Sequence, residues 1–258
     1  MRVSPDRPCP RSCLRALLPL IAAAWLGVLG QFIAGCETAA TNVTAPNAAS
    51  ATLDQAEQSA ITPDQAVARL AEGNHRFVTG ASLRRDYPAQ AKATSAHQYP
   101  FAVVISCIDS RSSPEIVFDQ GIGDLFVARV AGNYDPVDIL GSAEYATKVA
   151  GAKLVLVLGH TECGAIKGAI DNVELGNLTT VIRALQPAVA DVHDGEFGED
   201  RTSRNKKFVN AVAQANVRRT VANIRANSPV LRELEQSGRI KIVGAMHDIS
   251  TGEVTFIQ

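Results

Sequence analysis

The sequence of 258 residues lacks an excess of charge, a paired set of cysteines and a phosphate-binding loop. Its 25 basic and 26 acidic residues leave a net charge of −1, without the basic excess typical of nucleic-acid-binding proteins. The five cysteines are odd in number and sparse for this length, which argues against a disulfide framework. No glycine-rich loop has the strand, helix and lysine context that phosphate binding requires. The sequence therefore indicates neither a nucleic-acid-binding protein nor a nucleotide-dependent enzyme.

The first 35 residues have the profile of a signal peptide, which accounts for Cys9 and Cys13 as parts of a removable leader. Arginines precede an apolar stretch at 14–34, which proline and glycine interrupt, so it fits a membrane-spanning helix poorly. The residues Ile33-Ala34-Gly35-Cys36 are typical of a bacterial lipobox, in which the cysteine is acylated. The alternative is an uncleaved N-terminal anchor in which Cys36 has no role.

Both interpretations place the rest of the chain outside the cytoplasm. We expect a lipid-anchored protein of the cell envelope, on the periplasmic side, that meets the membrane only through its anchor. Glu37 follows the cysteine, which favours the outer membrane over the inner one.

Residues 36–60 are rich in Ala, Thr, Asn, Ser and Gln, and they offer little apolar surface to offset chain entropy. This composition predicts a flexible tether. Thr62-Pro63-Asp64-Gln65 then has the residue types that begin a helix, with threonine as the N-cap, proline at the first position and glutamine at the third. We therefore expect one folded domain at 61–258, without an internal repeat.

Four short apolar runs, rich in β-branched residues, predict central strands at 101–106, 125–130, 154–158 and 240–243. Between and after them lie helical stretches near 136–150, 164–173, 177–193, 205–226 and 228–237. This alternation predicts an α/β fold with a mainly parallel central β-sheet flanked by helices.

Residues suited to metal binding follow two of the predicted strands. Cys107 comes directly after the run at 101–106, and His160 and Cys163 follow the run at 154–158. Two thiolates and one imidazole suit zinc, and three protein ligands leave the fourth position open, as in catalytic sites. By itself His-x-x-Cys is weak evidence for a zinc site, because buried cysteines are often small core residues. A redox dithiol pair is a further alternative, although no Cys-x-x-Cys spacing supports it.

Cys-x-Asp-x-Arg at 107–111, followed about fifty residues later by His-x-x-Cys-Gly at 160–164, resembles the signature of β-class carbonic anhydrases. The resemblance covers roughly residues 62–258 and includes Gly73-Asn74-His75-Arg76-Phe77 and Ala131-Gly132-Asn133. It implies reversible hydration of CO2 to bicarbonate and a proton by a zinc-bound hydroxide. It also implies a homodimer or homotetramer in which each active site lies near the interface of a pair.

The resemblance assigns one Zn2+ per chain to Cys107, His160 and Cys163, and a catalytic dyad to Asp109 and Arg111. With two thiolates the site is formally neutral, so a bound water is acidified less than among three histidines. A carboxylate that orients this water is then useful, and an arginine can hold that carboxylate ionised. The alternative, an exposed ion pair, would contribute little.

The resemblance also assigns five residues to the substrate pocket: Gln98, Phe126, Ala131, Tyr145 and Gly164. In the family the glutamine contacts substrate, the aromatic residues form apolar walls and the alanine leaves room, while a glycine lets the backbone approach closely. An apolar pocket suits CO2, which has no charge. Each of these residues other than the glycine could instead belong to the core.

Two residues depart from the pattern of relatives. Val104 stands where some members carry a tryptophan beside a noncatalytic bicarbonate, which predicts a site in the open form. His247 stands where relatives often carry tyrosine, and the sequence assigns it no role. Two alternatives remain open: a CS2 or COS hydrolase on the same scaffold, and a noncatalytic zinc-binding envelope lipoprotein. The presence of both dyad residues argues against the latter.

Overall fold

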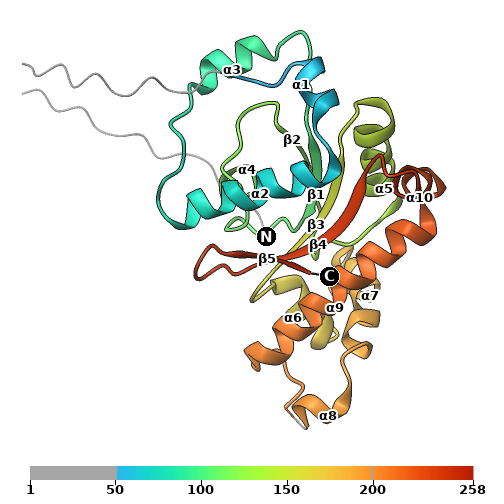
Figure 1. Cartoon of the computed structure of the whole chain (residues 1–258). Helices are drawn as coiled ribbons and strands as arrows, with labels where there is room; N and C mark the ends of the chain where they lie inside the picture. The colour runs from blue at the N-terminus through green and yellow to red at the C-terminus, as the bar shows by residue number, and fades with distance from the viewer. Residues whose placement is uncertain (1–50, 199, 258) are drawn as a thin grey trace, which may run out of the picture. The chain divides into compact units, whose positions relative to one another are not determined.

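A five-stranded sheet forms the centre of the computed structural model, which describes residues 51–198 and 200–257 (Figure 1). From one edge to the other, the strands are β2 (Leu125–Arg129), β1 (Ala102–Ser106), β3 (Leu154–His160), β4 (Lys241–His247) and β5 (Val254–Ile257). The first four are parallel, and β5 runs antiparallel to β4. The predicted α/β fold with a mainly parallel sheet is confirmed, whereas β5 was not predicted.

The apolar runs supply hydrophobic cores on both faces of the sheet. Every residue of β1 and β3 is buried, and successive side chains of a strand point to opposite faces. Val103 and Val155 therefore belong to one core, while Val104 and Leu156 belong to the other. This two-sided burial is the reason that these strands are continuously apolar rather than alternating.

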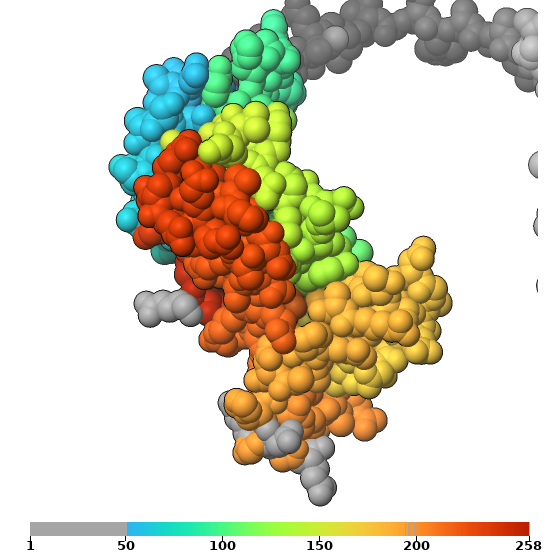
Figure 2. Space-filling model, turned by 90° about the vertical axis from the view of Figure 1, so that its right-hand side faces the viewer, coloured from blue at the N-terminus to red at the C-terminus, as the bar shows by residue number. Residues whose placement is uncertain are grey.

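Helices cover both faces (Figure 1). The helices that precede β1, together with the short α4 after it, are α1 (Gln55–Ala60), α2 (Pro63–Val78), α3 (Tyr87–Ala93) and α4 (Pro114–Val117). Those that follow β2 are α5 (Val137–Glu144), the π-helical turn η1 (Tyr145–Val149), α6 (Gly164–Ile170), α7 (Leu178–Ala190), α8 (Asp194–Phe197), α9 (Lys206–Asn227) and α10 (Pro229–Gln236). Helix α2 packs through Ala66 and Leu70 on one face, and α9 packs on β3 and β4 on the other. Figure 2 shows α9 and α10 beside the segment of α5 and η1.

Helix α1 lies within the predicted tether at 36–60, so the prediction that this whole segment is flexible is corrected. Asp54 and Glu57 form a capping box, in which each side chain accepts a hydrogen bond from the backbone N–H of the other. Gln58 is buried, and its amide donates to the carbonyl oxygens of Pro100 at 2.7 Å and Ala150 at 2.8 Å. The folded part therefore begins before residue 61, because a polar side chain provides the contact that the composition did not indicate.

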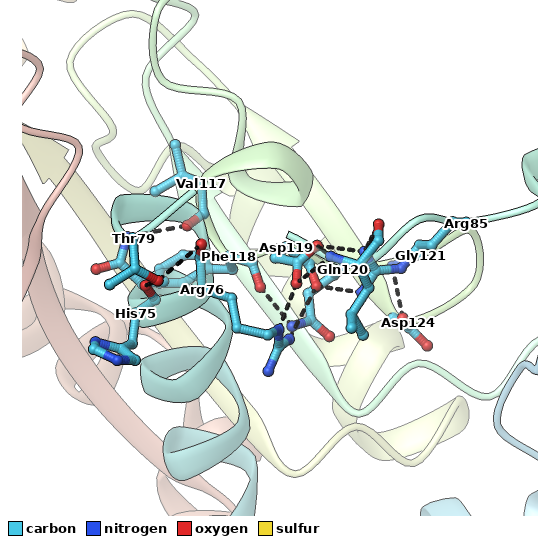
Figure 3. Close-up of polar contacts among 12 residues, drawn as sticks. His75, Arg76, Thr79, Arg85, Val117, Phe118, Asp119, Gln120, Gly121 and Asp124 are labelled. Atoms are coloured by element: carbon cyan, nitrogen blue, oxygen red, sulfur yellow. Dashed lines mark hydrogen bonds and ion pairs between the residues drawn. The ribbon is translucent and has the colours of Figure 1, made fainter. Parts of the chain in front are cut away.

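Asp119 connects the N-terminal helices to the segment that leads into β2 (Figure 3). Its carboxylate, with a side chain 3% exposed, accepts from Nε of Arg76 at 2.5 Å and from the guanidinium of Arg85. The backbone N–H of Leu83 also donates to it, at 3.3 Å. Burial alone would raise the pKa of Asp119, but the two arginines outweigh it and hold that pKa below its usual value. Asp119 thus fixes α2 and the loop after it through one ionised group.

The predicted signal peptide, Cys36 and most of the tether lie outside the described residues. Within residues 51–198 and 200–257, no helix is long and apolar enough to cross a membrane.

Candidate active site

Cys107, His160 and Cys163 meet at the carboxyl ends of β1 and β3. These strands are neighbours and pair from Ala102 with Leu154 onward, so the residues that end them lie side by side. The possible ligand atoms of the three residues all lie within 4.8 Å of one another, and all three residues are buried. The two sulfur atoms are 4.0 Å apart.

The chemistry of these donors fits zinc. Nδ1 of His160 lies 2.9 Å from the carbonyl oxygen of Thr161, so we assign the ring proton to Nδ1 and the free lone pair to Nε2. Nε2 is buried, and no hydrogen-bond partner for it lies within the described part of the chain. A buried polar atom without a partner is unfavourable, and a metal ion among two sulfurs and this nitrogen would satisfy it.

The surroundings of Cys107 favour a thiolate. The pKa of Cys107 is lowered to about 4, first by the hydrogen bond from the thiol of Cys163 and then, against burial, by His160 and the N–H of Gly132. The same contact, together with burial, raises the pKa of Cys163. Burial alone would lower the pKa of His160, but the neighbouring Cys107 outweighs it and raises that pKa. A cation at this position is what would allow both thiols to ionise together.

A tight turn after β2 supplies the N–H that faces Cys107. The N–H of Gly132 donates to the sulfur at 3.4 Å, and the amide of Asn216 donates to the carbonyl oxygen of Gly132 at 2.8 Å. Gly132 has φ +79°, and a Cβ there would lie 2.5 Å from Cδ1 of Leu185. Only glycine meets both conditions, which explains its place in the Ala131-Gly132-Asn133 motif.

Asp109 and Arg111 form a two-pronged ion pair beside the three ligands. Nε of Arg111 donates to Oδ1 of Asp109 at 2.9 Å, and Nη2 donates to Oδ2 at 2.7 Å. These bonds hold the pKa of Asp109 well below its usual value. Oδ2 of Asp109 lies 3.9 Å from Nε2 of His160, so the carboxylate borders the metal position while Arg111 holds it.

Residues that the sequence analysis did not assign hold this loop in place. The guanidinium of Arg129, the last residue of β2, donates to the carbonyl oxygens of Cys107 at 2.8 Å and Asp109 at 2.6 Å. Between the two ligands of the second motif, Glu162 has φ +57°, an uncommon conformation for a residue other than glycine, and its N–H donates to Asn210 at 3.0 Å. A charged residue at the end of an apolar strand was the only sequence signal for Arg129.

An apolar cavity of about 440 Å3 adjoins Cys107 and Asp109. Ala131 and Gly164, two residues assigned to the substrate pocket, line it, and Ile182 contributes an apolar wall. The structure therefore brings two of the five predicted pocket residues to the predicted metal site.

The other three predicted pocket residues do not line this cavity. Phe126 and Tyr145 contact each other, with ring centroids 6.1 Å apart, and line a separate cavity of about 700 Å3. Gln98 is exposed. Their assignment to the site therefore remains a prediction.

The fold and the site define a class of protein: an α/β enzyme with two cysteines and one histidine for zinc, an Asp–Arg dyad and an adjacent apolar cavity. The family model described as carbonic anhydrase matches residues 102–254. Carbonic anhydrase 2 of Mycobacterium tuberculosis is 37% identical over 193 residues, which cover 71% of this chain and 87% of that protein. The carbonic anhydrase of Pseudomonas aeruginosa is 34% identical over 188 residues, 67% of this chain and 81% of that protein.

Solved structures agree with these relatives. A structure from a study of two tetrameric β-carbonic anhydrases of Sordaria macrospora superposes with a TM-score of 0.59 and 26% identity, and covers 75% of this chain and 97% of that chain. The chain belongs to the carbonic anhydrase family, as a β-class member.

Proposed function

We propose that the chain hydrates CO2 reversibly to bicarbonate and a proton at a Zn2+ ion bound by Cys107, His160 and Cys163. When bound, zinc would lower the pKa of a water and so supply a nucleophile near neutral pH. The observation that carries the proposal is the carboxylate of Asp109, which borders the metal position and is held there by Arg111.

Asp109 orients the attacking oxygen. An ionised carboxylate only accepts hydrogen bonds, so Asp109 accepts a hydrogen bond from that oxygen and leaves a lone pair of the oxygen free to face the carbon of CO2. The two hydrogen bonds from Arg111 prevent the rotation of the carboxylate. The apolar cavity beside Ala131 and Gly164 receives CO2, which carries no charge for an ion pair to hold.

A second cavity next to the dyad is lined by charged side chains of both signs. It has a volume of about 630 Å3, and Asp109, Arg111, Lys167 and Lys206 are among its lining residues. Bicarbonate and the released proton would reach water through it, although Glu162 and Asp248 also line it and balance its cations.

The proposed site is completed by a second copy of the chain, in a homodimer or homotetramer. Large apolar side chains are exposed near β2, an edge strand of the sheet, with Val137 78%, Val149 71% and Tyr145 54% exposed. Such a surface is uncommon on a monomer. Contact across it would bring Phe126, Tyr145 or Gln98 of one chain to the metal ligands of the other. Light scattering on the purified protein tests this, and Val137→Asp is expected to give single chains with little activity, whereas a monomeric and active protein would contradict it.

The location of the protein is proposed from its N-terminal sequence alone. Cys36 in the lipobox-like segment would carry the acyl chains, and the enzyme would face the periplasm, at the outer membrane more than the inner. Labelling with a radioactive fatty acid is expected for the unmutated protein and absent for Cys36→Ser. Equal labelling of both would contradict the anchor.

Stopped-flow measurement of CO2 hydration, with zinc quantified in the same sample, tests the activity. We expect about one zinc per chain, and we expect Cys163→Ala to lose both metal and activity. Zinc binding without hydration between pH 7 and 9 would contradict the assignment. CS2 and COS, the substrates of the alternative hydrolase, are then assayed on the same sample.

A further inference from the structure

His247 is a buried titratable residue that the proposed mechanism does not use. It ends β4, pairs in register with the zinc ligand His160 on β3 and is 2% exposed. Its Nδ1 lies 3.0 Å from Oγ of Ser112, which is 1% exposed. A serine hydroxyl can donate or accept, so this hydrogen bond exists in either tautomer of the neutral ring.

One end of this contact leads to the dyad. Ser112 follows Arg111 directly, and its backbone N–H donates to the carbonyl oxygen of Asp109 at 3.0 Å, which closes the turn that carries both dyad residues. The hydroxyl of Ser112 therefore connects this turn to His247 at the end of β4, a strand that is distant in the sequence.

The other end leads to the metal ligand. The carbonyl oxygen of His247 accepts from the N–H of Thr161 at 3.0 Å, and the carbonyl oxygen of Thr161 accepts from Nδ1 of His160 at 2.9 Å. This second contact sets the orientation of the His160 ring and leaves Nε2 free for metal. His247 is thus the residue through which the dyad turn and the metal ligand are held to the same strand end.

We propose that His247 is a positioning residue that sets the carboxylate of Asp109 relative to the metal position through the hydrogen bond to Ser112. The proposal rests on the proposed function, because it concerns the dyad that carries it. A core histidine without this role would affect stability and leave the turnover of each zinc site unchanged.

The experiment compares purified full-length variants by kcat/KM per bound zinc and by melting temperature. His247→Phe keeps an aromatic ring, which is somewhat larger, and removes the bond, while Ser112→Ala removes the partner. Each is expected to lower kcat/KM about tenfold, as expected for loss of one buried hydrogen bond. The double variant is expected to lose no more than either single variant, because both changes remove the same contact. His247→Asn, which can keep a hydrogen-bonding atom near Nδ1, is expected to stay within about threefold of the unmutated protein.

Ser228→Ala is the matched control. Ser228 is also a buried serine with side-chain hydrogen bonds, to Glu144 at 2.5 Å and from the N–H of Leu231 at 3.1 Å, but it lies at the start of α10. It is expected to lower the melting temperature and leave kcat/KM per zinc unchanged.

Three outcomes would overturn the inference: an unchanged kcat/KM per zinc in Ser112→Ala, losses that multiply in the double variant, or a loss in His247→Asn equal to that in His247→Phe. Ser112→Ala keeps the test valid if the larger ring substitution prevents folding. The unmutated protein is assayed in parallel, since its inactivity would count against the proposed function, whereas its activity beside unaffected variants would count only against the role of His247.

Discussion

Replacement of Arg111 by alanine should slow CO2 hydration without removing zinc. Arg111 makes two charge-assisted hydrogen bonds to Asp109, at 2.9 and 2.7 Å, but its own side chain is 55% exposed. Bonds to charged groups are worth up to about 3 kcal/mol each when buried, and solvent screening at this exposure reduces the pair to about 2 kcal/mol. If that energy keeps Asp109 oriented in the transition state, kcat/KM falls about thirtyfold.

The pH dependence separates orientation from charge. Without Arg111 the pKa of Asp109 would return towards about 4, so its carboxylate would still be ionised between pH 7 and 9. The loss should therefore be constant over this range. Arg111→Lys keeps the charge but not the two-pronged geometry, and we expect it to recover only part of the activity. Added guanidinium should also restore part of the activity of Arg111→Ala, because the site is open to solvent.

Stopped-flow kinetics per bound zinc measure these effects. The control is Arg239→Ala, which changes an exposed arginine in the turn between α10 and β4. An Arg111→Ala variant within twofold of the unmutated protein would refute the reasoning and reduce the dyad to a surface ion pair. A loss that disappears at higher pH would show instead that Arg111 acts on the charge of Asp109 and not on its orientation.

Three other changes test how the fold supports the site. Asp119→Asn should lower the free energy of unfolding in urea by about 3 kcal/mol at pH 7, because Arg85 loses its buried ionised partner. Since the folded-state pKa of Asp119 is lowered, this contribution is present above the usual value of 3.8 and is lost as the pH falls below it. The stabilities of the two proteins should therefore converge at low pH, and a constant difference would contradict the ion pair. Gly132→Ala should weaken zinc binding at least tenfold in a chelator competition, because the N–H that faces the sulfur must move, and unchanged affinity would show that this N–H is not needed. Gln58→Ala should lower the free energy of unfolding by about 1–2 kcal/mol, because two backbone carbonyl groups lose their donor. An unchanged free energy of unfolding would show that α1 does not stabilise the folded domain.

The elements that the sequence predicted are those whose signal is local. The runs in β1 and β3 are apolar throughout because both faces of the sheet are covered, and the start of α2 at Thr62 and Pro63 follows from its capping box. By contrast, β5 has four residues, none of them fully buried, so it lacks the continuous apolar run of a central strand. Helix α1 has the same kind of local signal, a capping box of Asp54 and Glu57, and was missed because the polar composition around it hides the one buried glutamine that anchors it.

The same distinction applies to the site. Cys107, His160 and Cys163 were predictable because the reactive residues follow strands and the order of parallel strands brings their ends together. Arg129 was not, because its contacts are with backbone carbonyl groups, which leave no pattern in the sequence. The contact of Ser112 with His247 joins residues 135 positions apart, and neither residue type suggests the other.

The contacts that hold the metal site run across the sheet rather than along one strand. The turn after β2 donates an N–H to the sulfur of Cys107, and β4 holds the backbone that orients His160. The connections that follow β1, β2 and β3 must therefore all be in place before the ligands and the dyad have their positions. Zinc binds this arrangement and not a chain in which these contacts are open, so metal binding and the closure of the carboxyl edge of the sheet stabilise each other. Removal of zinc should accordingly loosen the turns at this edge, seen as faster amide exchange at residues 107–112 and 160–164, before it affects β1 and β3, whose burial does not depend on the metal.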